Sequence, residues 1–261
     1  KKTIIRYSQF SIPNPWGLAF NEYGQDLFLH TSGTSFSWML PGMVKARYGA
    51  NMKAPSILKS NQVRPTSGVE FVSSRHFPDE VQGDVLINNN IGFLGIKQHQ
   101  MIDEDPGFTT QYRQDLLVSK DLNFRPTDLE FAPDGSLYVV DWQNALIGHM
   151  QHSARDPNRD HTHGRIYRVT YPSRPLVKPA KIDGASIPQL LENLKLPEYR
   201  SRYRTRRELR GRNADEVVKA TLKWVDALPK EADERLKLEA LWVTWGAKQT
   251  NFALLRKLID S

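Results

Sequence analysis

The sequence predicts a mostly β N-terminal part followed by an all-α C-terminal part. Up to about residue 170, short alternating segments bounded by prolines and tight turns recur three times, which is typical of antiparallel strands. A proline-rich stretch follows at 172–186. Beyond it, apolar residues recur at spacings of about three and four residues, which indicates amphipathic helices.

Each β unit begins at a proline and contains an alternating strand, a turn and a second apolar strand. These prolines are Pro15, Pro65 and Pro126, so the units are 50 and 61 residues apart. In the third unit the turn is Asp134-Gly135, a strong hairpin signal because glycine tolerates a positive φ. Unequal spacing suits radial blades joined by variable loops. We therefore predict that residues 1–171 are the C-terminal part of a β-propeller, with about three blades.

The connections between the units carry weaker signals. We interpret Ser32 to Gln62 as an elaborated loop between strands, because it is polar and contains three glycines. Apolar runs at 91–96 and 116–118 predict two further strands around an acidic turn at 103–107.

The C-terminal part divides into a linker and a helical segment. Proline restricts the chain and removes hydrogen-bond donors, so 172–186 is predicted to be a linker on the surface. Residues 187–261 are predicted to form five short helices, with Gly211 as a C-cap and Asn213 or Asp215 opening the third. Short helices in antiparallel pairs suggest the beginning of a HEAT-like array.

Composition limits the chemistry that the chain can perform. The 261 residues contain no cysteine, which excludes disulfides, thiolate metal sites and c-type haem attachment within this segment. The net charge of +7 arises entirely after residue 170, where 19 Lys and Arg face 12 Asp and Glu. No aromatic and basic recognition motif accompanies that charge, so we do not predict nucleic-acid binding. The sequence also contains no apolar run long enough to span a membrane.

Four of the seven histidines fall within fifteen positions of the third unit. They are His149, His152, His161 and His163, with two Arg and two Asp residues between them. A blade needs only a turn there, and long loops are often functional. Three interpretations remain open. The charged residues can brace the loop, the loop can contact a cofactor or substrate, or it can bind a metal ion.

Further candidates lie where the predicted strands end. A carboxylate after a strand can act as a general base or hold a cation, or it can cap backbone amides in a turn. Arginines there can hold an anionic cofactor or form surface ion pairs. The predicted catalytic residues are His149, His161 and Asp141. The predicted cofactor contacts are Arg75, Arg125, His152, His163 and Arg165. The predicted substrate contacts are Trp142, Asn144, His76 and Asn89. The predicted metal ligands are Asp156 and Asp160.

Several of these segments together resemble a known family. They are 73–78, 124–126, 133–142, 147–152, 155–170, 203–212 and 238–243. Through them the chain is similar to the membrane-bound dehydrogenase family of large bacterial exported proteins. In that family, a propeller similar to quinoprotein sugar and sorbosone dehydrogenases precedes a HEAT-like array and a c-type haem domain.

The resemblance implies an exported, periplasmic oxidoreductase. It implies oxidation of a sugar-like alcohol or aldehyde, with pyrroloquinoline quinone (PQQ) and calcium as cofactors and electrons passed to a haem domain outside this segment. In the sugar dehydrogenases a histidine accepts the hydroxyl proton and arginines hold the quinone carboxylates. No motif here maps residue by residue onto that site. The alternative is a non-catalytic propeller that binds a glycan or a protein beside the haem domain.

Overall fold

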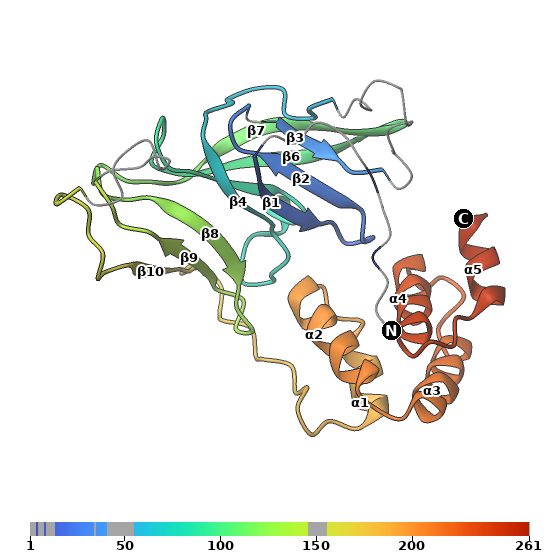
Figure 1. Cartoon of the computed structure of the whole chain (residues 1–261). Coiled ribbons are helices and arrows are strands. Elements are labelled where there is room, and N and C mark those ends of the chain that lie inside the picture. Colours follow the sequence, from blue (N-terminus) through green and yellow to red (C-terminus); the bar gives the residue numbers. More distant parts are fainter. Residues whose placement is uncertain are drawn as a thin grey trace. The chain divides into compact units, whose positions relative to one another are not determined.

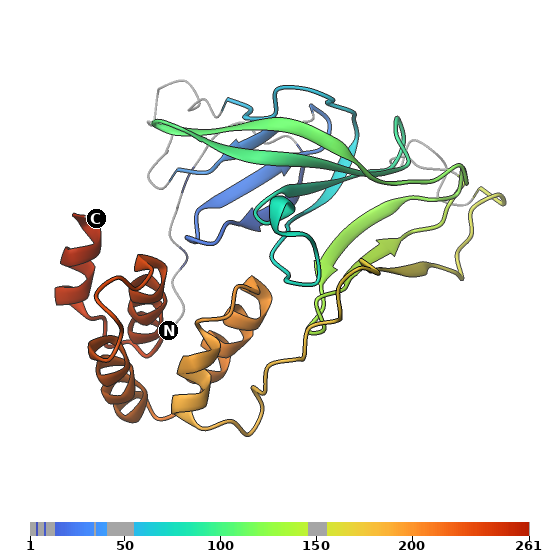
Figure 2. The same ribbon diagram turned by 180° about the vertical axis from the view of Figure 1, so that it is seen from behind.

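The chain forms two compact units, which are described separately. A computed structural model describes residues 4, 8, 14–33, 35–40, 55–145 and 156–260. The first unit comprises residues 1–72, 77–130 and 137–171 and contains the β-strands. The second unit comprises residues 172–261 together with the short segments 73–76 and 131–136, and it contains the α-helices (Figures 1 and 2). The predicted order of a β part and an α part is therefore confirmed.

The first sheet has the strand order β1-β2-β3, with β1 at Pro15–Phe20, β2 at Asp26–His30 and β3 at Ser35–Trp38. A turn with Gly24 at φ +76° connects β1 and β2, as the sequence predicts. The interpretation of Ser32 to Gln62 as loop alone is wrong, because β3 lies within it. Ser35–Trp38 forms a hairpin with residues 27–30 of β2, and its alternation of serine and aromatic residues is a strand signal that the loop interpretation overlooked.

The second sheet has the order β4-β5-β6-β7. Its strands are β4 (Thr66–Phe71), β5 (Val85–Asn89), β6 (Gly95–Glu104) and β7 (Gly107–Val118), and a short 3-10 helix, η1 (Asp79–Val81), precedes β5. The strand predicted at 91–96 begins only at Gly95. Ile91 is half exposed, so the apolar run there does not mark a buried strand.

The third sheet has the order β10-β9-β8. It contains β8 (Pro126–Phe131), β9 (Leu137–Asp141) and β10 (Arg165–Val169). In the predicted Asp-Gly turn, Asp134 Oδ1 accepts hydrogen bonds from the amide and hydroxyl of Ser136, and Gly135 has φ +82°. The turn therefore forms as the sequence predicts.

Small residues let the first strands of the three sheets approach closely. A Cβ on Gly17 of β1 would lie 2.7 Å from a Val69 methyl of β4, and one on Gly68 of β4 would lie 2.8 Å from the Asp128 Cα of β8. The hydroxyl of Ser67 also donates to the carbonyl of Pro126 at 2.7 Å. The β4 sheet thus lies between the other two.

Apolar side chains between the sheets form the core of the first unit. The strands β2, β4 and β5 are buried on both faces, which is the pattern of strands covered on two sides. The buried apolar residues include Leu27, Leu29, Phe36, Val69, Phe71, Val85 and Ile87.

The described part of the second unit contains five α-helices. They are α1 (Ile187–Asn193), α2 (Tyr199–Arg210), α3 (Ala214–Asp226), α4 (Glu234–Gly246) and α5 (Phe252–Ile259). Gly211 is the C-cap of α2, and the Asn213 side chain accepts hydrogen bonds from two amides at the start of α3, as predicted. Among the described residues, no helix has the length and apolar character needed to cross a bilayer.

The helices share a core that contains one buried ionic cluster. Its apolar part includes Leu190, Leu191, Leu194, Leu209, Val217, Trp224 and Leu241. Within the unit, the fully buried Glu239 carboxylate accepts hydrogen bonds from Arg202 and Arg206, at 2.8 and 2.5 Å. Arg202 also donates to the carbonyls of Leu196 and Pro197.

Candidate functional site

Polar side chains gather at one edge of the three sheets of the first unit. In each sheet the first two strands are antiparallel, so the residues before the first strand lie beside those after the second. In the first sheet, the carbonyl of Asn14 accepts the amide of Thr31. In the third, the carbonyl of Arg125 accepts the amide of Trp142. This edge therefore collects the ends of strands far apart in the sequence.

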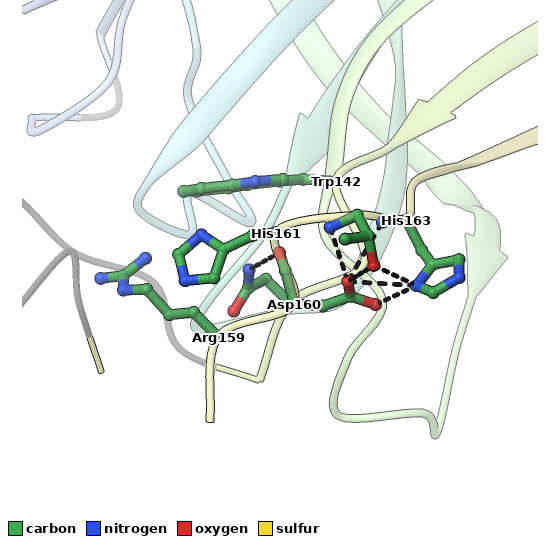
Figure 3. A pocket seen from close by; sticks show the side chains of 7 residues that line it. Trp142, Arg159, Asp160, His161 and His163 are labelled. Atoms are coloured by element: carbon green, nitrogen blue, oxygen red, sulfur yellow. Dashed lines mark hydrogen bonds and ion pairs between the residues drawn. The ribbon is translucent and has the colours of Figure 1, made fainter. Parts of the chain in front are cut away.

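A pocket of about 500 Å³ lies at this edge in the third sheet. Its lining residues are Trp142, Asn144, Arg159, Asp160, His161, Thr162 and His163, and we call it the Trp142 pocket. Figure 3 shows the Trp142 ring beside the His161 imidazole, with Arg159 nearby and with Asp160 and His163 together on the other side. The pocket therefore combines an aromatic face with imidazole and guanidinium groups.

Asp160 organises its loop by accepting several hydrogen bonds. Its Oδ1 accepts the amide and hydroxyl of Thr162 at 2.9 and 3.0 Å and the amide of His163 at 3.0 Å. The Nδ1 of His163 lies 2.9 Å from Oδ2. Hydrogen bonds, first that of the Thr162 amide, lower the pKa of Asp160 to about 2, so the carboxylate is charged and already satisfied at neutral pH.

Trp142 and Asn144 line the pocket from the segment that follows β9. Trp142 is 39% exposed, whereas Asn144 is buried. The Asn144 Nδ2 donates to the carbonyl of Asp160 at 3.2 Å. This bond connects the segment after β9 to the segment that carries His161 and His163, which we call the histidine loop. Between Trp142 and Asn144, Gln143 has φ +51°, an uncommon conformation for a residue other than glycine.

Asp141 and Arg125 form hydrogen bonds with the backbone of the segment after β9. The Asp141 Oδ1 accepts the amides of Arg125 and Gln143 at 2.7 and 2.8 Å. The guanidinium of Arg125 donates to three backbone carbonyls, those of Asn90, Asn144 and Ala145. Burial lowers the pKa of Arg125, against the opposing effects of Asp141 and Asp121.

Five residues predicted from the sequence line the Trp142 pocket together. They are Trp142, Asn144, Asp160, His161 and His163. Arg159 and Thr162 were not predicted as site residues, although both lie inside the histidine-rich segment. Their signal in the sequence was their position beside Asp160, His161 and His163, which were predicted as site residues.

Other predicted residues have different surroundings. Arg75 lies in the second unit and forms an ion pair with Glu198 at 2.7 Å. His76, also in the second unit, is buried with Nδ1 3.0 Å from the carbonyl of Pro175. Arg165 pairs with Asp121 at 2.8 Å, and this hydrogen bond is the main cause of its raised pKa. Their predicted roles in cofactor and substrate binding remain predictions.

The remaining candidates concern the loop and the second sheet. Asn89 is buried, and its Nδ2 donates to the carbonyls of Val63 and Pro65. Asp156 accepts the amide of Asn158 at 2.9 Å, which is a turn interaction. His149 and His152 lie outside the described residues. Within the described ranges, no group of three or more His, Cys, Asp or Glu side chains is suited to a metal ion.

Several buried polar atoms at the same edge have no hydrogen-bond partner among the described residues. They are the hydroxyls of Thr31 and Thr66, both side-chain polar atoms of Asn88, the Oδ1 atoms of Asn89 and Asn90, and the Oδ2 of Asp141. Buried polar atoms of this kind normally bind ordered water or a ligand. The edge is therefore rich in acceptors that require donors from solvent or ligand.

Comparison with known proteins identifies a family. Residues 5–173, more than half of the chain, match the family described as Domain of unknown function (DUF7133). The chain belongs to the DUF7133 family. No curated protein matches the chain significantly.

Solved structures similar to this DUF7133 chain include sugar dehydrogenases. An oxidoreductase (glucose dehydrogenase) of Thermus thermophilus is 18% identical over 59% of this chain and 43% of its own, with a TM-score of 0.41. The soluble aldose sugar dehydrogenase of Escherichia coli is 18% identical over 49% and 41%, with a TM-score of 0.38. The PQQ-bound aldose sugar dehydrogenase of Streptomyces coelicolor is 16% identical over 67% and 52%, also with a TM-score of 0.38. The chain thus spans about two fifths to one half of these proteins.

Proposed function

We propose that this chain is part of an oxidoreductase-like propeller that binds a sugar-like alcohol or aldehyde in the Trp142 pocket and oxidises it. The observation that carries the proposal is the composition of that pocket. An exposed indole, two imidazoles and a guanidinium line one cavity of about 500 Å³, and the only carboxylate among the described lining residues is already satisfied.

This composition suits a sugar ring. The indole of Trp142 offers an apolar face to the C–H groups of the ring, while polar groups around it bind the hydroxyls. Acceptors at the same edge, such as Asp141 Oδ2 and Asn90 Oδ1, favour a hydrated, hydroxyl-rich ligand.

His161 is the residue that we assign as general base. It is exposed in the pocket, and its imidazole makes no hydrogen bond to another described residue. A neutral imidazole there can accept the proton of a substrate hydroxyl while a hydride leaves the same carbon. His163 is different, because its Nδ1 lies beside Asp160 and the ring is held in place. We assign His163 to orientation of the loop.

The donors in the pocket fit a quinone that carries carboxylates. Arg159, with the imidazole of His163, would hold carboxylate and carbonyl oxygens, and Asp160 adds no unsatisfied negative charge. A bound quinone such as PQQ would supply the two-electron acceptor for the hydride. The described residues fit calcium less well, because Asp156 and Asp160 both accept hydrogen bonds from their own turns.

The wider architecture belongs to the same proposal. We propose that the helices form a HEAT-like array and that the three sheets are propeller blades. We also propose that electrons pass to a haem domain outside these 261 residues, in an exported, periplasmic protein.

The alternative is a propeller that binds a glycan or a protein without catalysis. The engagement of Arg75, Arg125 and Arg165 with the protein's own acceptors favours that alternative.

Binding and reduction of PQQ separate the two functions. The chain is titrated calorimetrically with aldoses and polyols, and quinone absorbance is then followed with PQQ and calcium present. We expect sugar-dependent quinone reduction that is lost in Trp142→Ala and His161→Ala. Tyr138→Ala is the matched control, because Tyr138 lies on β9 and is also 39% exposed, yet does not line the pocket. Sugar binding without quinone reduction would support the binding propeller.

A further inference from the structure

An arginine just before the first strand of each later blade reaches back to the preceding blade. Before β4, Arg64 Nη1 donates at 3.4 Å to the carbonyl of Ser32, which follows β2. Before β8, Arg125 Nη1 donates at 2.9 Å to the carbonyl of Asn90, which follows β5. Each arginine directly precedes the proline of its unit, and each binds a carbonyl just after the second strand of the preceding blade, two residues after β2 for Arg64 and one residue after β5 for Arg125.

Arg125 does more than its counterpart. Its Nε donates to the carbonyl of Asn144 at 3.0 Å, and its Nη2 donates to that of Ala145 at 3.3 Å. One planar guanidinium thus joins the end of β5 to the segment that carries two lining residues of the Trp142 pocket. A lysine has the same charge but a single nitrogen, so it cannot hold three carbonyls in fixed directions.

The backbone of Arg125 is held from the other side. Its amide donates to Asp141 Oδ1, and its carbonyl accepts the amide of Trp142 at 3.0 Å. Asp141 also accepts the amide of Gln143, which lies between Trp142 and Asn144 with φ +51°. Strained backbone persists only where its surroundings determine it, and it is often found at functional sites. Here, Arg125 and Asp141 are those surroundings.

We propose that Arg125 is a positioning residue that sets the geometry of the Trp142 pocket through backbone carbonyls. It connects to the pocket in two steps. Its guanidinium holds the Asn144 carbonyl, and the Asn144 side chain holds the Asp160 carbonyl in the histidine loop. The effect on catalysis rests on the proposed function, whereas the effect on pocket geometry does not.

This role differs from a contact with an anionic cofactor. A cofactor contact requires positive charge facing the ligand, and Arg125→Lys would preserve that charge. A positioning role requires the planar fork, and Arg125→Lys would lose it. The lysine variant therefore discriminates between the two roles.

The test uses the 261-residue chain labelled with 5-fluorotryptophan. The chain contains six tryptophans, and Trp142→Phe identifies the fluorine signal of position 142. We expect Arg125→Lys and Arg125→Gln to shift or broaden that signal without any ligand. Arg64→Lys is the matched control and should leave it unchanged. An unchanged Trp142 signal in both Arg125 variants would overturn the proposal.

Oxidation of glucose with PQQ present provides the second readout. If glucose binds the unaltered chain, Arg125→Lys should lower kcat/KM on the order of 100-fold, because small displacements of positioning groups have effects of that size. Arg64→Lys should change it less than about twofold. If glucose does not bind the unaltered chain, the proposed function fails, while the fluorine measurement still tests the positioning role.

A measurement on the unaltered chain covers the case in which the Arg125 variants do not fold. The amides of Trp142 and Asn144 donate to the carbonyls of Arg125 and Asn123. If Arg125 holds this segment as one piece, the two amides should open together and show equal hydrogen-exchange protection within about tenfold. Exchange of the Asn144 amide at the rate of an unprotected loop would contradict the proposal.

Discussion

Replacement of Glu239 by glutamine should strongly destabilise the helical unit. The Glu239 carboxylate is fully buried and accepts hydrogen bonds from Arg202, whose side chain is 1% exposed, and Arg206, whose side chain is 14% exposed. Glutamine has nearly the same shape, so the change leaves no cavity. It removes the only negative charge that either arginine contacts in this cluster of described residues.

The magnitude follows from the burial of these charges. Removal of one partner from a buried ion pair typically costs about 3–5 kcal/mol, because the remaining charge is desolvated and unpaired. The backbone carbonyls of Leu196 and Pro197 still accept from Arg202, so we expect a loss near the lower end, about 3 kcal/mol. Urea unfolding of the whole chain, followed by helical circular dichroism at 222 nm, measures the change in the free energy of unfolding.

A matched exposed pair serves as the control. Glu208 pairs with Arg212 at 2.6 Å, and both side chains are about one third exposed. Because water screens such pairs, Glu208→Gln should cost less than about 1 kcal/mol. If Glu239→Gln costs no more than Glu208→Gln, the assignment of a buried ion cluster to the helical core is wrong.

Three further predictions concern the β unit. The Asp160 pKa is lowered to about 2 from an ordinary 3.8, so its hold on the histidine loop should be intact above pH 4 and lost as the pH falls through 2, as NMR signals of the loop amides would show. Burial, with a smaller effect of Lys97, lowers the pKa of His99 from 6.5 to about 4. The unit should therefore lose stability as the pH falls from 6.5, most steeply between these two pKa values, and the loss should level off below pH 4. His99→Gln should flatten that dependence in urea titrations. Gly68→Ala should lower the free energy of unfolding by about 1–3 kcal/mol, because the added Cβ would meet the backbone of Asp128. Gly107→Ala should be tolerated, because a Cβ there would have no neighbouring atom closer than 3.9 Å. Equal midpoints of thermal unfolding for the two variants would refute the close strand contact.

Local signals predicted the elements of the fold well. The Asn213 cap, the Gly211 end of α2 and the Asp134-Gly135 turn all depend on neighbouring residues, and the structure confirms each. Short elements were harder to predict. Ser35–Trp38 has only four residues, and its alternation of serine and aromatic residues was overlooked within a polar segment. The apolar run that begins at Ile91 does not enter a strand until Gly95, and the Ile91 side chain is half exposed.

The candidate site was predictable where residue type determines the chemistry. His161 and His163 were selected as chemically capable residues in an overlong loop, and Trp142 was selected at the end of a predicted strand. The structure places all three in one pocket. The surroundings of the arginines were not predictable. Arg125 binds backbone carbonyls from two distant segments, and a carbonyl has no signature in the sequence. For the same reason, the ion pair of Arg75 with Glu198 appears only after folding.

The most direct test of the account is calorimetric titration of the 261-residue chain with PQQ and with glucose, followed by the quinone absorbance of the mixture. The account predicts that both bind, that glucose reduces the quinone, and that Trp142→Ala abolishes the glucose response while Tyr138→Ala preserves it. Absence of glucose binding to a folded chain, or a response that Trp142→Ala leaves intact, would contradict the assignment of the Trp142 pocket as the site of sugar oxidation.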